Sequence, residues 1–359
     1  PSLFLGNSSL REVVAFDESR ILIFDVTTEN EFLSERKEYL KDDLELIYKL
    51  DSDILDKYWV RYIYFGEKER VWFSKTFLRK VGIDKLFSGG AEIFDIYPEV
   101  VYVLITVDTE RDLPPVLSSY LGVEEGVPLI LELLERYEVR ATFFVTGEVM
   151  ERYPEVISKI LQNHEVGLHG MFHEDFTLLE KGEKRKRILM AQDALEGLSE
   201  RAYSFRAPGH SADTELLNIL EELGFNVEAS AHRDISYPYH PSEKNWLIEG
   251  EMKILRIPLS HTPEYFYPSA IYDKSFTDAY RYVLESQKYK ALKVVVIGVH
   301  SWEFVELEVL GHESYSKPSG EYTYQSLEEL FKYLKHKNTR FLTVREFFEI
   351  WMSGRRDKV

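Results

Sequence analysis

The sequence predicts an α/β protein whose larger part is a (β/α) barrel, distorted or incomplete and TIM-like, preceded by a small α+β domain. Two observations support this. From about residue 100 to the C-terminus, short apolar runs alternate with longer amphipathic segments, which is the pattern of parallel βα units. Roughly six to eight such units would form a closed or nearly closed barrel. In addition, the ionisable residues of this part gather where apolar runs end.

The N-terminal region has a different pattern. Three segments rich in β-branched and aromatic residues are expected to be strands, namely 11–18, 20–26 and 59–67. Residues 29–50 have the spacing of an amphipathic helix. A Gly-Gly pair followed by Pro98 marks a boundary, so we predict an accessory domain over 1–98 and a catalytic domain over 99–359. No motif assigns a role to 1–98, which we expect to cover the barrel or mediate association.

The barrel elements follow in order along the chain. Expected strands are 101–107, 141–147, 165–169, 202–208, 225–230, 253–260, 293–300 and 339–344. Expected helices between them are 127–138, 153–164, 183–200 and 213–224, with further helical segments before the last two strands.

Composition narrows the classes of function. The net charge of −18 argues against a nucleic-acid partner or an anionic membrane surface. The absence of cysteine excludes disulfides, thiolate metal sites and cysteine nucleophiles. No apolar run is long enough for a membrane helix, and no secretory signal is visible, so a cytoplasmic location is favoured. A cysteine-free chain rich in Glu and Lys also fits a thermophilic source. Composition does not predict the oligomeric state.

Ionisable side chains follow several expected strands directly. Active sites of (β/α) barrels lie at the carboxyl ends of the strands, so we expect these residues to meet there. They are Asp108 and Glu110 after the first strand, His169 and His173 after the third, Arg206 after the fourth, Glu228 in the fifth, and His300 after the seventh. His210, His232 and His261 also lie near strand ends, but no spacing singles them out.

The pair His169 and His173 is the best candidate for a metal site. Two histidines four residues apart can reach one point from a single turn. With one carboxylate from Asp108 or Glu110 they make a three-ligand set that leaves positions for water and substrate. The alternative is an ordinary polar loop.

Five motifs together resemble the polysaccharide deacetylase family, also described as NodB-homology or carbohydrate esterase family 4 enzymes. They are TVDTE, ATFFVTG, GLHGMFH, SFRAPGH and VIGVHSWE, and they occur in the family's order. The resemblance begins at about residue 100 and leaves 1–98 unexplained. It implies a NodB-type barrel and metal-dependent hydrolysis of an N-acetyl amide on an amino sugar, with zinc expected and cobalt or nickel as alternatives.

The resemblance also implies residue roles. His169 and His173 match the family's metal-binding histidines, and Asp108 matches its catalytic base. Arg206 matches the arginine that fixes this base, and His300 matches the general acid. A backbone N–H near Pro208 and Gly209 would help to stabilise the oxyanion.

The sequence departs from the family at two places. Thr109 stands where most members have a second aspartate, so Glu110 becomes the candidate third ligand, with Asp108 as the alternative. The motif that usually supplies a carboxylate to the general acid is also altered, and Glu228 or Asp234 could substitute.

Trp302 fits either a core position or a sugar-stacking role.

Two other functions stay open. One is hydrolysis of a different C–N bond, as in a formamide, cyclic ureide or imide, and the other is a non-catalytic fold that binds glycans.

Overall fold

The structure is a computed structural model in which the chain divides into two compact units, Pro1–Val100 and Val101–Val359. It describes residues 3–5, 21–24, 62–65, 84–88, 92–95, 100–199, 201–232, 235–261, 276–287, 292–307, 320–335 and 337–356. No helix within these ranges has the length and apolar character needed to cross a membrane.

The first unit contains a five-stranded sheet. Its strands are β1 (Leu3–Leu5), β2 (Ile21–Phe24), β3 (Tyr62–Phe65), β4 (Asp84–Ser88) and β5 (Glu92–Asp95), in the order β1-β2-β3-β5-β4. The pairs from β1 to β3 are parallel and those involving β5 are antiparallel. Strands are therefore present within 20–26 and 59–67. The strand expected at 11–18 and the helix expected at 29–50 lie outside the described residues, and the accessory role stays a prediction.

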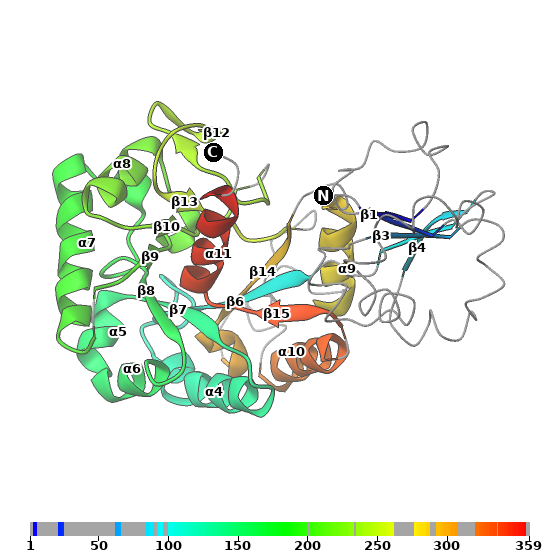
Figure 1. The fold of residues 1–359 in the computed structure, drawn as a ribbon. Coiled ribbons are helices and arrows are strands. Elements are labelled where there is room, and N and C mark those ends of the chain that lie inside the picture. The colour runs from blue at the N-terminus through cyan, green and yellow to red at the C-terminus, as the bar shows by residue number, and fades with distance from the viewer. Residues whose placement is uncertain are drawn as a thin grey trace. The chain divides into compact units, whose positions relative to one another are not determined.

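The second unit is a curled sheet in which every pair along the main path is parallel, with helices against it (Figure 1). The path is β13-β10-β9-β8-β7-β6-β14, and β15 also pairs with β6. The bounds are β6 (Val101–Thr109), β7 (Ala141–Val145), β8 (Glu165–Leu168), β9 (Ser204–Phe205), β10 (Val227–Glu228), β13 (Leu255–Arg256), β14 (Lys293–His300) and β15 (Thr339–Phe341). Among the described residues no strand ladder joins β13 to β14, although the Ser260 N–H after β13 donates to the Val296 carbonyl of β14 at 3.0 Å, so this is the incomplete (β/α) barrel that the sequence predicts.

The helices of this unit alternate with its strands. They are α4 (Val127–Arg136), α5 (Gly147–Arg152), α6 (Pro154–Ile160), α7 (Lys181–Glu196), α8 (Thr214–Glu222), α9 (Phe276–Ser286), α10 (Glu321–Leu334) and α11 (Val344–Arg356). The predicted amphipathic segments account for most of them. A small antiparallel hairpin, β11 (Pro241–Ser242) and β12 (Asn245–Glu249), lies between β10 and β13 in the sequence.

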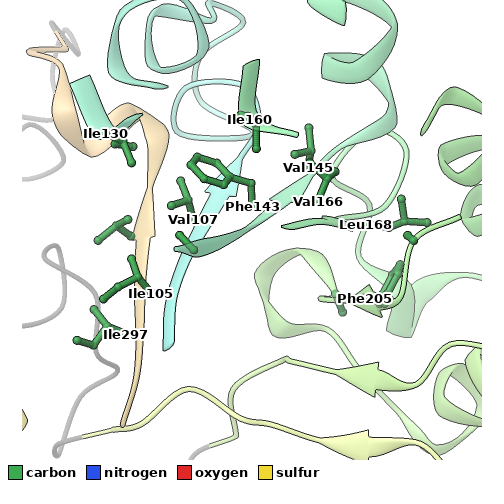
Figure 2. Close-up of a cluster of buried hydrophobic side chains, with 14 of the residues drawn as sticks. Ile105, Val107, Ile130, Phe143, Val145, Ile160, Val166, Leu168, Phe205 and Ile297 are labelled. Atoms are coloured by element: carbon green, nitrogen blue, oxygen red, sulfur yellow. The ribbon is translucent and has the colours of Figure 1, made fainter. Parts of the chain in front are cut away.

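The strands of the main path are buried on both faces, and alternate residues of β6 enter different clusters. Ile105 and Val107 of β6 pack in the cluster that holds Ile130 of α4 and Phe143 of β7 (Figure 2). Leu104, one position away, belongs to a second cluster. That cluster contains Phe144, Val227, Leu255, Val294 and Val296, together with Val344, Phe347 and Phe348 of α11. One face of the sheet therefore packs under the surrounding helices, and the other forms an interior that α11 fills.

Candidate active site

The candidate residues continue the interior face of the sheet at its carboxyl end. Because side chains alternate along a strand, Asp108 lies on the same face as Leu104, and Glu110 follows on that face two residues later. His300 has the same relation to Val294 and Val296 on β14. Along the interior face of β6 and β14, the side chains thus change from apolar to ionisable where the strands end.

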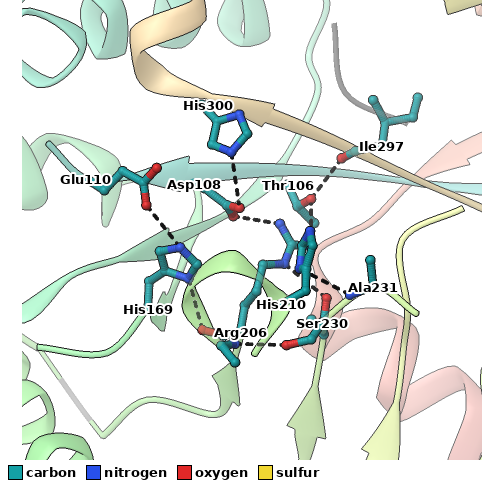
Figure 3. A network of polar contacts seen from close by, with 12 residues as sticks. Thr106, Asp108, Glu110, His169, Arg206, His210, Ser230, Ala231, Ile297 and His300 are labelled. Carbon is teal, nitrogen blue, oxygen red and sulfur yellow. Dashed lines mark hydrogen bonds and ion pairs between the residues drawn. The ribbon is translucent and has the colours of Figure 1, made fainter. Parts of the chain in front are cut away.

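Strand register brings Asp108 and His300 together. In the parallel pairing of β6 with β14, His300 is the partner of Asp108, and Thr106 Oγ1 donates to the Ile297 carbonyl at 2.8 Å. His300 Nε2 lies 4.0 Å from Asp108 Oδ2. Two ionisable groups separated by nearly two hundred residues in sequence therefore face the same point (Figure 3).

Asp108 is held by a fully buried arginine. Arg206 Nη1 donates to Asp108 Oδ1 at 2.6 Å, its Nη2 donates to Thr106 Oγ1 at 3.0 Å, and its Nε donates to the Ala229 carbonyl at 3.0 Å (Figure 3). The guanidinium carbon lies 4.3 Å from the centre of the Phe144 ring. Burial opposes ionisation of Asp108, but the charge of Arg206, followed by the interactions with the His169 and His300 rings, outweighs it and lowers the pKa to about 2. Asp108 is therefore a carboxylate throughout the neutral range.

Glu110, His169 and His173 form a group whose potential ligand atoms all lie within 4.8 Å of one another. Glu110 Oε2 is 3.1 Å from His169 Nε2 and 3.0 Å from His173 Nε2. His173 has a positive φ of 62°, which turns the backbone back toward the strand end. This is the group of three ionisable residues in the described part of the chain that could hold a metal ion.

The chemistry of the donors fits a cation at this point. His169 Nδ1 lies 2.9 Å from the Arg206 carbonyl, and because a carbonyl can only accept, this nitrogen carries a proton. In the neutral ring the lone pair of Nε2 then faces Glu110 Oε2. That oxygen is buried and forms no hydrogen bond of ordinary geometry with any described residue. Two electron-rich groups facing each other in a buried site are stabilised by a cation between them.

The same histidines govern the charge state of Glu110. Burial opposes ionisation, but the contacts with His169 and His173 dominate and hold the Glu110 pKa well below its usual value. For His173, burial lowers the pKa and the Glu110 carboxylate raises it, with a net increase. Glu110 is therefore an ionised carboxylate, the form that binds metal ions.

His300 lies beside a carboxylate that sequence analysis did not single out. Glu303 Oε2 accepts the backbone N–H of His300 at 2.7 Å and lies 3.3 Å from its Nδ1. Burial lowers the His300 pKa, but Glu303, and then Glu110 and Asp108, outweigh it and raise the pKa to about 9. The signal in the sequence is the i, i+3 spacing of a helix cap, because His300 is the N-cap of the 3₁₀ turn Ser301–Phe304 and Glu303 is its third residue.

Glu228, the residue expected to serve His300, has other partners. Its Oε2 accepts from Arg256 Nε at 2.7 Å, and its Oε1 accepts the backbone N–H of Ser230 at 2.8 Å. Both Glu228 and Arg256 are fully buried. The two residues are also register partners in β10 and β13. Glu228 thus forms a structural ion pair, and the other candidate, Asp234, lies outside the described residues.

The segment after Arg206 turns sharply beside these groups. Pro208 is buried, whereas Gly209 is exposed and has a φ of 56°. His210 follows with a φ of 58°, and its Nδ1 accepts the Ala231 N–H at 3.2 Å (Figure 3). Burial, and then the Arg206 charge, lower the His210 pKa to about 3, so this ring is neutral.

The ring of Trp302 lies between two of the candidate groups. Its Nε1 donates to Glu110 Oε1 at 3.3 Å, and the ring stacks on His300 with centres 4.6 Å apart. The predicted residues from four strand ends are thus brought together, with Glu303 added and Glu228 directed elsewhere.

Part of the chain is similar to known proteins. Residues 100–227 match the family model of polysaccharide deacetylase. A peptidoglycan deacetylase-like protein of Gibberella zeae is 26% identical over 180 residues, covering 43% of this chain and 53% of that protein. A chitooligosaccharide deacetylase of Bradyrhizobium is 32% identical over 105 residues, covering 27% and 48%. The chain thus spans about half the length of these curated relatives.

The fold is shared with solved structures. A Mycobacterium smegmatis protein assigned to the polysaccharide deacetylases superposes with a TM-score of 0.55 at 20% identity, covering 72% of this chain and 93% of that one. At this identity the likeness concerns the fold alone. The family match and the order of the motifs around the site make residues 100–227 similar to the polysaccharide deacetylase family.

Proposed function

We propose that this protein removes the acetyl group from an N-acetylated amino sugar, within a glycan or oligosaccharide, by metal-assisted hydrolysis of the amide. The observation that carries the proposal is the convergence of three devices at one strand end. A carboxylate held ionised lies 4.0 Å from a histidine of raised pKa, and both interact electrostatically with a Glu-His-His cluster. The relatives' names, which specify deacetylases of peptidoglycan and chitooligosaccharide, support the choice of substrate class.

Glu110, His169 and His173 would hold the metal, with zinc expected because two imidazoles and one carboxylate are ligands it favours. When bound, a divalent cation supplies Lewis acidity that polarises the amide carbonyl and makes water more acidic. Three protein ligands leave positions open for substrate. Asp108 stays outside this set because Arg206, itself anchored on Thr106, orients it.

Asp108 acts as the general base. It accepts a proton from the water whose oxygen attacks the acetyl carbon, and its Oδ2 faces His300 rather than Arg206. Arg206 keeps the Asp108 carboxylate ionised and fixes its plane. A buried carboxylate without such a partner would lose its charge. The backbone N–H of Gly209, on an exposed turn, is our candidate donor to the oxyanion.

His300 acts as the general acid. Its raised pKa keeps it protonated at neutral pH, so that Nε2 can donate a proton to the leaving nitrogen as the C–N bond breaks. Glu303 maintains that charge from the other side of the ring. The products are the free amine of the sugar and acetate.

Metal analysis and a substrate panel test the proposal together. The wild type should hold about one divalent ion per chain and release acetate from N-acetylglucosamine oligomers. The His169→Ala/His173→Ala variant should lose both. Cyclic ureides and formamides in the same panel test the alternative that another C–N bond is cleaved. Binding of oligomers without acetate release by the metal-loaded protein would instead favour a non-catalytic glycan-binding fold.

A further inference from the structure

We propose that Trp302 is a positioning residue that directs the Glu110 carboxylate toward His169 and His173 and, with the same ring, fixes the plane of His300. The inference rests on the metal site of the proposed function, but it does not depend on which amide is cleaved. One side chain would thus support both Glu110, the proposed third metal ligand, and His300, the proposed general acid.

The hydrogen bond from Trp302 gives the two carboxylate oxygens of Glu110 different partners. Trp302 Nε1 donates to Oε1 at 3.3 Å, while Oε2 faces the two histidines at 3.1 and 3.0 Å. Glu110 is 1% exposed, so solvent cannot replace a lost donor on Oε1. A glutamate side chain has three rotatable bonds, and one hydrogen bond on the rear oxygen sets the direction of the front one.

The second contact is with His300. The two rings are stacked, with centres 4.6 Å apart and an angle of 22° between their planes. Stacking restrains rotation of the imidazole about its Cβ–Cγ bond, which decides whether Nε2 faces Asp108. A protonated imidazole is also attracted to the face of an indole.

The backbone that carries Trp302 is itself tightly held. A Cβ added to Gly122 would lie 2.4 Å from the Trp302 backbone nitrogen, and one added to Gly126 would lie 2.2 Å from the Ser301 carbonyl oxygen. Both glycines belong to the π-helical turn Gly122–Gly126 that precedes α4. The 3₁₀ turn Ser301–Phe304 therefore rests directly on the backbone of this segment.

The support leads back to the strand end from which Glu110 comes. The buried Asp112, two residues after Glu110, accepts the backbone N–H of Leu121 at 2.8 Å and that of Gly122 at 2.9 Å. Contacts thus run from the Glu110 segment through Asp112 to Gly122, on to Trp302, and back to Glu110. A closed series of contacts of this kind can hold the Glu110 carboxylate within the small positional tolerance that a metal site requires.

Exposure favours this role over direct stacking on a sugar. Trp302 is 8% exposed, and one face of its ring is covered by His300. Little of the Trp302 ring is left to contact substrate, whereas Glu110 and His300 both lie within contact distance of it.

The test is metal affinity in Trp302→Phe, which keeps an aromatic ring for stacking but removes the N–H donor. We expect Zn²⁺ affinity, measured by competition with a chromogenic chelator, to fall about 10- to 100-fold. The absorption spectrum of the Co²⁺-loaded protein should also change. Trp351→Phe is the matched control because it removes an indole donor to His240 Nε2, and it should leave metal affinity unchanged.

Equal Zn²⁺ affinity in Trp302→Phe and wild type would overturn the inference, as would a wild type that binds no metal. If Trp302→Phe fails to fold, benzothienylalanine at position 302 replaces the N–H by sulfur with almost no change of shape, and the same loss of affinity is expected. A protein that binds metal with these differences but deacetylates nothing would refute the proposed function and leave the role of Trp302 intact.

Discussion

Replacing Glu303 with glutamine is expected to move the alkaline limb of the pH–activity profile to lower pH. The substitution keeps an oxygen that can accept the His300 backbone N–H but removes the charge that lies 3.3 Å from Nδ1. A general acid must be protonated, so activity that depends on His300 is present below its pKa and is lost as pH rises through it. In wild type that pKa is raised to about 9.

The size of the shift follows from Coulomb's law. For unit charges at the 3.3 Å separation, the interaction is about 1 kcal/mol at a dielectric constant of about 80 and about 5 kcal/mol at about 20. Since one pKa unit corresponds to about 1.4 kcal/mol, the His300 pKa should fall by roughly 1 to 4 units in Glu303→Gln. A bound cation lowers the pKa in both proteins, so the difference between them is the quantity to compare.

Two measurements check this prediction. The profile of kcat/KM against pH, followed by acetate release, reports the acid of the free enzyme. An NMR titration of the His300 ring reports its pKa without turnover. Glu306→Gln is the matched control, because Glu306 is an exposed acid three residues further along the chain. Coincident alkaline limbs in wild type and Glu303→Gln would refute the reasoning.

Three further predictions concern the base, the metal and the backbone support. Asp108→Asn should retain its metal but lose about 10²- to 10⁴-fold in kcat, and a variant that keeps most of its turnover would exclude Asp108 as the base. Chelation should lower the melting temperature of wild type but not of His173→Ala, since a ligand at about 100 times its Kd adds about 2.7 kcal/mol to the free energy of unfolding. Gly122→Ala should lower that free energy by about 1–3 kcal/mol in urea titrations because its Cβ meets Trp302 backbone. Gly182→Ala, where nothing lies within 4 Å, should not, and similar losses in both would contradict the clash.

Much of the fold could be predicted because its signals are local. The short apolar runs of β6 and β14 and the helical period of α4 and α8 need only neighbouring residues. Strand geometry also explains why Glu110 could take the place of an aspartate adjacent to Asp108. Residues two apart on a strand share a face, so this glutamate stays beside Asp108. The strand end therefore predicts both carboxylates, although spacing alone did not decide which of them faces the histidines.

The partners of Glu228, His300 and Trp302 could not be predicted because they depend on contacts that local sequence does not encode. Glu228 was a reasonable candidate for His300, but pairing of β10 with β13 places Arg256 against it. The carboxylate beside His300 is that of Glu303 instead, because both residues belong to the cap of one short turn. Likewise, the contact of Trp302 with Glu110 joins residues 192 positions apart, which no local pattern encodes.

The pairing of β6 with β14 also has a consequence for how the molecule opens. This eight-residue ladder is buried on both faces, so its amides should exchange with deuterium only when the whole unit unfolds. The turn that carries His173 is short, has a positive φ, and leaves that side chain 18% exposed. Its amides should exchange through local opening. Asp108 and His300, the proposed base and acid, would then lie in the most persistent part of the unit, while a metal ion at the proposed site could enter and leave through a turn that opens without separating them.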